Sequence, residues 1–177
     1  EQSPSASLAS KPAHIISLAL ILVFVVWGTA WRLASGWSAD DGVHLRFSSV
    51  YSVQDYLFNP ELLRIASYAN LTPLLNLFYS FNLGQFGLDA SAWRASLGAL
   101  SVAAVAAFYA ASSQYMRPAL ALFVVGAWVL GVPFFYTAAT FMTSHYMLGM
   151  LGASLCVWSF FRWVRQGTGV YLVGAVL

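Results

Sequence analysis

Hydrophobic residues occur in long runs along this chain, separated by short polar segments. Residues 14–34, 93–111, 118–135 and 146–164 each carry charge only near their ends, and a helix needs about 20 apolar residues to cross a bilayer. A fifth run, residues 170–177, reaches the end of the sequence without a polar tail. The pattern predicts an all-α integral membrane protein with about four transmembrane helices and the start of a fifth, cut from a longer polypeptide.

The first apolar run has an alternative interpretation. Gly28-Thr29-Ala30 resembles the small-residue cleavage site of a secretory signal peptide. The run is long for the apolar part of such a signal, which favours an uncleaved helix over residues 14–34. Before it, the polar and Ser/Ala-rich residues 1–13 predict a mobile tail.

Residues 35–92 hold most of the acidic side chains and are predicted to lie outside the hydrocarbon as one long outer loop. The acids of this loop are Asp40, Asp41, Asp55, Glu61 and Asp89. Within the loop we expect two short interfacial helices, at 48–57 and 60–68. The second of these has Asn59 as its N-cap and Pro60 at its first position.

Residues 71–86 are apolar, yet they are interrupted by Pro73, Asn76, Asn82 and Gly84. If this stretch does not span, one face of the membrane receives Lys11, Arg117, Arg162 and Arg165, and the loop acids fall on the other face. If it spans, that segregation is lost. Because cytoplasmic loops carry the excess of Lys and Arg, we expect residues 71–86 to lie in the interface or to re-enter shallowly. The N-terminus is then cytoplasmic and the first loop periplasmic or luminal.

Composition narrows the function classes. Sixty per cent of the residues are hydrophobic and 8 % are charged, against roughly a quarter charged in soluble domains. The net charge of +2, without a basic block, excludes nucleic acid as a partner. The single cysteine, Cys156, forms neither an internal disulfide nor a cysteine metal cluster. Seven Trp and nine Tyr predict an aromatic belt at the membrane interfaces.

The strongest chemical feature is the pair Asp40-Asp41, just beyond the first apolar run. Two adjacent carboxylates repel each other, so one is expected to serve as a proton acceptor beside an apolar interface. His44 and Arg46 follow at short spacing. Two alternatives remain open: Asp-Asp-Gly also makes a good turn, and the pair is a candidate ligand for a divalent cation, although no full ligand set accompanies it.

Other polar residues also have two interpretations. Arg94 either contacts a lipid phosphate or pairs with Asp89 at the start of its span. His145 either faces a substrate cavity at the outer end of a span or is an interfacial residue. Arg162 and Arg165 are interpreted as anchors that fix the topology.

Two further motifs follow the first loop: Thr-Pro-Leu-Leu-Asn at 72–76 and Phe-Gly-Leu-Asp-Ala-Ser-Ala-Trp-Arg-Ala-Ser at 86–96. In their order after the first span and the Asp pair, they resemble the N-terminal part of the GT-C superfamily of membrane glycosyltransferases. That superfamily includes the protein O-mannosyltransferase-like and lipid A aminoarabinose transferase-like enzymes. The resemblance covers nearly the whole chain and is carried by Pro73, Leu74, Phe86, Gly87 and Arg94.

The resemblance implies an enzyme that takes a sugar from a polyprenyl-phosphate carrier and transfers it to an acceptor at the outer face. It implies that Asp40 or Asp41 is the base, or a metal ligand in some branches. From the residues themselves, His44, Arg94 and His145 are the substrate-binding candidates. No other cofactor is expected, and the partners are membrane lipid and the carrier. Leu71-Thr72-Pro73 replaces the His-Pro-Pro or Lys-Pro-like element of the family, which leaves the acceptor open. The carrier-phosphate ligands of later loops are absent, so the chain is not expected to be a complete enzyme.

A non-enzymatic alternative is an accessory helical subunit that packs around a larger membrane complex. Small residues at 95–111 and 149–154 suit close helix contacts. This interpretation applies if the chain is complete. A transporter fragment is a weaker third hypothesis, because it predicts charged or broken helices at mid-membrane and the apolar runs contain no acid there.

Overall fold

The computed structural model describes residues 10–30, 36–38, 41–66 and 73–176. Within these residues the regular elements are all helices, which confirms the all-α prediction for this part of the chain. Asp40 and residues 1–9 of the predicted tail lie outside the described residues.

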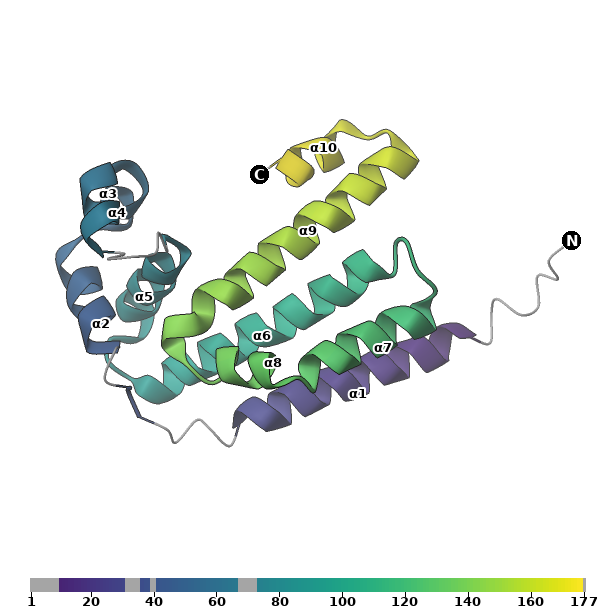
Figure 1. Ribbon diagram of the computed structural model, residues 1–177, viewed down its shortest axis with the longest axis horizontal. Helices are drawn as coiled ribbons and strands as arrows, with labels where there is room; N and C mark the ends of the chain where they lie inside the picture. Colours follow the sequence, from purple (N-terminus) through teal and green to yellow (C-terminus); the bar gives the residue numbers. More distant parts are fainter. Residues whose placement is uncertain (1–9, 31–35, 39–40, 67–72, 177) are drawn as a thin grey trace, which may run out of the picture.

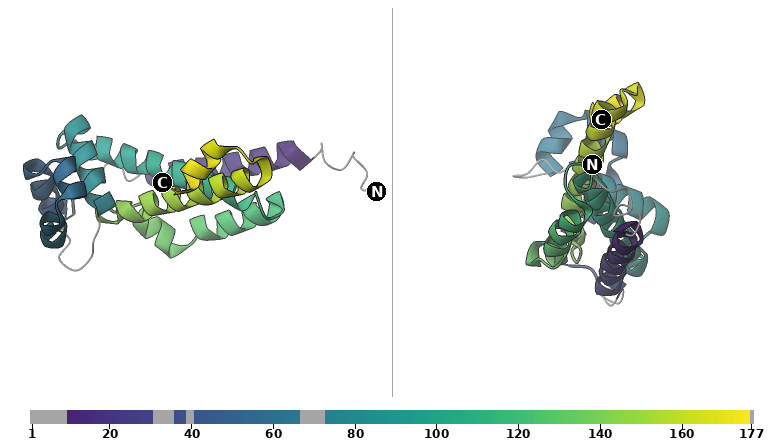
Figure 2. Two further views of the ribbon diagram at one scale, coloured as in Figure 1. Left: turned by 90° about the horizontal axis from the view of Figure 1, so that it is seen from above. Right: turned by 90° about the vertical axis from the view of Figure 1, so that its right-hand side faces the viewer.

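Four helices run side by side as a bundle (Figures 1 and 2). They are α1 (Ser10–Ala30), α6 (Ala90–Ser112), α7 (Pro118–Val129) and α9 (Ser144–Gln166). Helix α6 packs against α1, α7 and α9, and is therefore the central helix of the bundle. The last helix, α10 (Gly169–Val176), folds back along α9.

Four shorter helices lie together at one end of the bundle, and we call them the cap (Figure 1). They are α2 (Asp41–Val50), α3 (Val53–Phe58), α4 (Pro60–Ala66) and α5 (Pro73–Phe86). Helix α5 contacts α2, α3, α6 and α9, so it joins the cap to the bundle.

Local capping explains where the cap helices begin. The Asn59 side chain accepts hydrogen bonds from the backbone of Glu61 and Leu62, which confirms it as the N-cap of α4. The predicted helix at 48–57 is wrong in its bounds, since α2 ends at Val50 and α3 begins at Val53. A capping box between Ser52 and Asp55 starts the new helix at that point.

The predicted continuous helix at 118–135 is broken in two. Helix α7 ends at Val129, and α8 (Val132–Thr137) begins after Gly131, whose backbone is extended. Pro133 explains the break, because its ring has no N–H and would clash with the carbonyl four residues earlier in a continuous helix. A 3₁₀ turn, η2 (Phe141–Thr143), then leads into α9.

Two groups of buried side chains hold the molecule together. The aliphatic core lies in the bundle and includes Val25, Ala104, Val105, Val125, Val129, Phe134 and Met147. The aromatic cluster lies where the cap meets the bundle and includes Leu75, Phe78, Tyr79, Trp93, Leu97 and Phe141. Tyr79 and Trp93 are 0 % exposed, so both rings pack inside the molecule.

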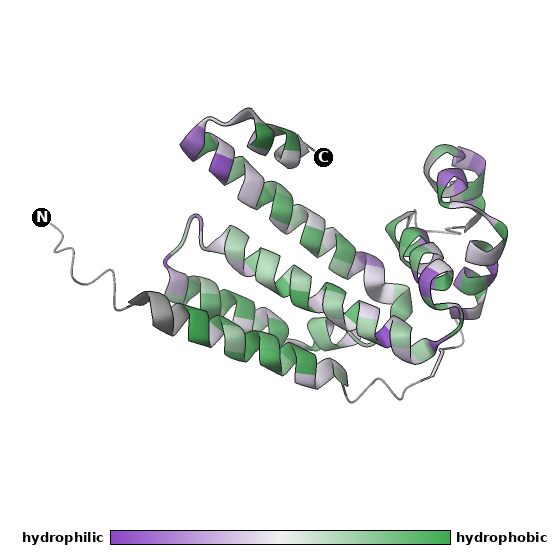
Figure 3. Ribbon diagram, turned by 180° about the vertical axis from the view of Figure 1, so that it is seen from behind, coloured by the Kyte–Doolittle hydropathy of each residue, from purple (hydrophilic) through white to green (hydrophobic). Residues whose placement is uncertain are grey.

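The outer faces of the bundle are apolar. Figure 3 shows hydrophobic residues along α1, α6, α7 and α9, and hydrophilic ones in the cap and at the end of α9. In the part of the chain that the structure describes, two helical stretches are long and apolar enough to cross a membrane, Ala90–Ser112 and Phe141–Gln166. The described apolar parts of α1 and α7 are shorter, Ile15–Ala30 and Pro118–Val129.

Candidate functional site

Asp41 is a buried carboxylate at the first position of α2. One of its oxygens accepts a hydrogen bond from the Tyr79 hydroxyl at 2.5 Å, and the other accepts one from the Ser38 backbone N–H at 2.6 Å. A carboxylate at a helix N-terminus is also favoured by the helix dipole. Asp41 therefore fixes the start of α2 against α5 and the preceding segment. Gly42 lies inside α2, so the alternative of an Asp-Asp-Gly turn is wrong.

Tyr79 connects Asp41 to the aromatic cluster. Its ring lies 5.1 Å from Trp93 and 5.2 Å from His44, measured between ring centroids. Trp93 in turn lies 4.9 Å from Trp37, in an edge-to-face arrangement. Such edge-to-face pairs are favourable beyond the area they bury. The cluster therefore holds Asp41 and His44 in one place, although they come from a different helix than Tyr79.

Trp93 and Arg94, the first bulky residues of α6, anchor that helix to three loops. The Trp93 indole N–H donates to the Gly87 carbonyl at 2.9 Å, in a turn where Gly87 has a positive φ of 58° that favours glycine. The Arg94 guanidinium donates to the carbonyls of Gly36, at 2.7 Å, and Ala139.

The charge of Arg94 lies over an aromatic ring. Its guanidinium carbon is 4.1 Å from the centroid of Phe141, a cation–π arrangement. Asp41 and Arg94 are thus placed on two sides of the same aromatic cluster. The predicted pairing of Arg94 with Asp89 is not the arrangement found: the Asp89 carboxylate caps α6 by accepting from the backbone of Ser91 and Ala92.

Two exposed acids at helix starts in this half of the molecule are firmly ionised. Hydrogen bonds from Ser91 and Ala92 hold the pKa of Asp89 below its ordinary value, with the Ser91 side chain contributing most. Hydrogen bonds from Ser52 lower the pKa of Asp55 in the same way. Both carboxylates are used in capping, so the candidate chemistry rests on the Asp pair.

His145 lies apart from this network. It is in the first turn of α9, where its Nδ1 is 3.0 Å from the Met142 carbonyl and its ring is 4.0 Å from that of Tyr146. These contacts are all local in sequence. The structure therefore brings His44 and Arg94 to the aromatic cluster with Asp41, and leaves His145 at the start of α9.

An apolar groove of about 360 Å³ runs between α1 and α6. Its lining is Val26, Thr29, Ala30, Arg94, Ala95, Gly98, Ala99 and Val102. Because Arg94 is the lining residue of α6 nearest the cap, the described lining of the groove has a cation at the cap end and mainly small apolar residues along the rest. Its shape and chemistry suit a hydrocarbon chain that carries an anionic head.

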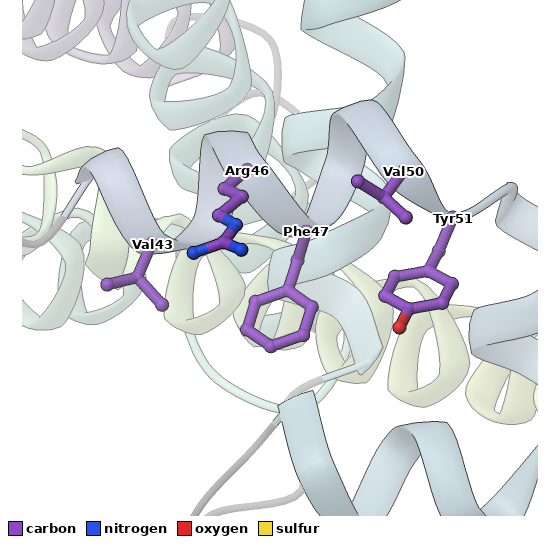
Figure 4. Close-up of a pocket in the computed structure, with 5 residues that line it drawn as sticks. All are labelled: Val43, Arg46, Phe47, Val50 and Tyr51. Carbon is purple, nitrogen blue, oxygen red and sulfur yellow. The ribbon is translucent and has the colours of Figure 1, made fainter.

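A second hollow, of about 390 Å³, lies on α2 and is drawn in Figure 4. Val43, Arg46, Phe47, Val50 and Tyr51 line it. These residues lie on a different face of α2 from Asp41, and Val43 and Val50 are largely exposed. Helix α2 therefore has one face packed on the aromatic cluster and one exposed apolar face.

Two buried amides on α5 leave acceptor capacity unused. The Asn76 and Asn82 side-chain oxygens are buried and accept no hydrogen bond from the residues that the structure describes.

Within those residues there is also no group of three or more His, Cys, Asp or Glu side chains that could hold a metal ion.

Sequence reasoning missed Tyr79, Trp93 and Ser38 as parts of this site. Tyr79 and Asp41 are 38 positions apart, and nothing in a single sequence indicates that they meet. A weak signal existed in α5, where Asn76, Tyr79 and Asn82 recur every three residues within an apolar stretch and therefore share a helix face.

Comparison of the chain with protein-family models, with curated proteins and with solved structures found no match.

Proposed function

We propose that the chain is part of a membrane-embedded glycosyltransferase that uses a polyprenyl-phosphate sugar as its donor. The observation that carries the proposal is the joining of a buried, doubly hydrogen-bonded Asp41 and the cation Arg94 by one aromatic cluster, at one end of an apolar helix bundle. A cation at the edge of an apolar region suits the phosphate of a lipid-borne donor, and Asp41 fixes the start of the helix that follows Asp40 in the chain.

Placement in the membrane is the first part of the proposal. Helices α1, α6 and α9, together with the α7–α8 pair, act as four spans, and α10 is the start of a fifth. Helix α1 has 21 residues and is about 31 Å long at the usual rise, close to the thickness of a hydrocarbon core. Large apolar side chains on its outer face are exposed, among them Ile15, Leu20, Val23 and Trp27, and soluble proteins rarely expose such continuous apolar surface.

The cap then lies at the outer interface, with the N-terminus in the cytoplasm. Its exposed residues include the apolar Val43, Val50, Phe58 and Ile65 together with charged ones, a composition found in helices that lie flat at a membrane surface. Helix α5 has 14 residues and is about 21 Å long, which is too short to cross the hydrocarbon. It serves as a platform under Asp41.

We assign different roles to the two acids. Asp41 is buried and both of its oxygens are occupied by donors, so it has no access to an acceptor substrate. Asp41 is a positioning residue that fixes the start of α2, and Asp40, next to it in the chain, is the base. A general base contributes typically a factor of about 10² to 10⁴ in rate.

The chemistry follows from these roles. Asp40 takes the proton from the acceptor's nucleophilic hydroxyl or amine as that atom forms a bond to the anomeric carbon of the sugar. The bond between this carbon and the carrier phosphate oxygen breaks, and its electron pair leaves with the polyprenyl phosphate. Arg94 favours the anionic leaving group through its charge, and the groove between α1 and α6 takes the adjoining part of the prenyl chain.

The test is sugar transfer by the full-length protein in vesicles with a polyprenyl-phosphate sugar. Asp40→Asn should lower the rate by about 10² or more, and Asp41→Asn should lower it less. Asp55→Asn is the matched control, because it removes an acid from the same cap outside the aromatic cluster, and its rate should equal that of the wild type. Full activity in Asp40→Asn would refute the assigned mechanism.

One observation favours a second candidate function, an accessory subunit of a larger membrane complex. The groove between α1 and α6 is lined by Ala95, Gly98 and Ala99, and small residues of this kind also admit a partner helix. In that case a transmembrane helix of another protein fills the groove. Stable co-purification with such a protein, together with unchanged assembly in Asp40→Asn and Asp41→Asn, would favour this function over transfer.

A further inference from the structure

The end of the bundle opposite the cap carries three arginines. Arg117 immediately precedes α7, and Arg162 and Arg165 lie in the last turns of α9. The two arginines of α9 are three positions apart and therefore lie on one side of that helix. This end appears in Figure 1 where the α6–α7 turn and the end of α9 lie near each other.

Specific contacts bring the α6–α7 turn to the end of α9. The Arg165 guanidinium donates to the Gln114 side-chain oxygen at 3.1 Å and to the Gln114 carbonyl. The rings of Tyr115 and Phe161 lie 5.4 Å apart. Arg117 follows two residues after Tyr115, at the end of the same turn. We call this end of the bundle, with Arg117, Arg162 and Arg165, the basic face.

No acid balances the basic face among the described residues. Their acidic side chains are Asp41, Asp55, Glu61 and Asp89, all in the cap or at the cap end of α6. Arg117 is the N-cap of α7 and makes no side-chain capping bond, so its charge is not used in capping that helix.

Apolar and aromatic side chains surround these cations. The Arg162 guanidinium lies over the ring of Trp158 at 5.4 Å. Tyr115 is 54 % exposed and Val164 is 59 % exposed. A surface that mixes cations with exposed aromatic and aliphatic groups matches the boundary between lipid headgroups and hydrocarbon.

We propose that the basic face binds the phosphate of an anionic glycerophospholipid, such as phosphatidylglycerol, in preference to a zwitterionic lipid. Arg162 and Arg165 contact the headgroup, while Tyr115 and Val164 lie at the level of the upper acyl chain. The inference rests on the membrane placement proposed above and is independent of the sugar-transfer chemistry.

The test uses the full-length protein in nanodiscs that contain phosphatidylglycerol and phosphatidylcholine in equal amounts. The measurement is the ratio of the two lipids that stay bound on extraction, determined by native mass spectrometry. A juxtamembrane cation contributes about fivefold in affinity for anionic lipid. The double variant Arg162→Gln/Arg165→Gln should therefore lower the phosphatidylglycerol preference by about 30-fold.

The matched control is Arg46→Gln/Arg64→Gln, which removes the same charge from the cap. Because Asp55, Glu61 and Asp89 lie near these arginines in sequence and oppose anionic lipid, the control should lose clearly less of the preference. The second variant, Arg162→Lys/Arg165→Lys, keeps the charge without the Arg165 contact geometry and should retain most of the preference. If the glutamine variant fails to fold, the salt dependence of the wild-type preference for phosphatidylglycerol tests the proposal instead. Headgroup attraction must weaken as ionic strength rises.

Equal lipid ratios in the wild type and Arg162→Gln/Arg165→Gln would overturn the proposal, as would an equal loss in the control or a preference insensitive to salt. A preserved lipid preference together with full transfer activity in Asp40→Asn would leave the basic face in place and remove only the proposed enzyme mechanism.

Discussion

The aromatic cluster and the aliphatic core are built from different side chains for different purposes. The aliphatic core joins α1, α6, α7, α8 and α9 through small and branched residues such as Val105, Val125 and Ala104. The aromatic cluster joins α5, α6 and η2 through Tyr79, Trp93 and Phe141. The aromatic cluster also makes directional contacts to a carboxylate, a guanidinium and a backbone carbonyl.

This difference shows which side chains fix the positions of polar groups. Branched aliphatic residues hold helices together without fixing any polar group. Large rings with hydrogen-bonding edges position the charged groups around them. The chain therefore combines an adaptable bundle with a rigid polar junction, which is why we place the candidate chemistry at the junction.

Truncation of one buried side chain in each group should give the largest difference in stability between the aromatic cluster and the aliphatic core. Trp93→Ala removes a fully buried ring and should cost about 3 to 5 kcal/mol of stability. Val105→Ala should cost less, about 2 kcal/mol or below, because helix packing inside a membrane gains little from the hydrophobic effect. Unfolding titrations in detergent measure both, and equal costs would remove the distinction.

Removal of one hydroxyl tests the directional contact between the aromatic cluster and Asp41. Tyr79→Phe keeps the ring and deletes the hydrogen bond to Asp41, so the variant should lose about 1.5 to 3 kcal/mol, the usual range for a bond to a charged group. Tyr136→Phe is the control, since Tyr136 is 59 % exposed and its loss should change nothing. Amide exchange should increase in α2 for Tyr79→Phe alone; unchanged exchange there would show that the bond does not hold the helix.

Glycine substitutions test how closely the bundle helices approach. An added Cβ at Gly149 meets no atom within 4 Å, whereas one at Gly98 meets the Thr29 hydroxyl at 3.3 Å. Gly149→Ala should therefore raise stability by about 0.8 to 1 kcal/mol through helix propensity, and Gly98→Ala should gain clearly less. Equal gains in the unfolding titration would mean that α1 and α6 are not tightly packed at this level.

Acid should weaken the capping of the α6 N-terminus by Asp89 while leaving the bundle intact. The folded-state pKa of Asp89 lies below its ordinary value of 3.8, so its stabilising effect is complete above that value and is lost as pH falls through the lower folded pKa. Exchange of the Ser91 and Ala92 amides should rise in that range. Asp89→Asn should abolish this pH dependence, and a persisting acid response at these two amides would assign it to another group.

Most helices could be predicted from the sequence, but only part of the contacts between the cap and the bundle could be. The apolar runs and the Asn59-Pro60 start located most helices, because those signals are local. The break at Gly131 was missed, since the hydrophobic run continues through it and only Pro133 indicates it. The Tyr79–Asp41 bond was also missed, because it depends on how α2 and α5 meet in space.

The most direct test of the central claim is the rate of sugar transfer as a function of pH, for the full-length wild type, Asp41→Asn and Asp40→Asn. We expect the wild-type rate to rise with pH as the base loses its proton. Asp41→Asn should show the same midpoint with a lower plateau, and Asp40→Asn should stay near zero throughout. A wild-type midpoint retained in Asp40→Asn, or no transfer by the wild type at any pH, would contradict the claim.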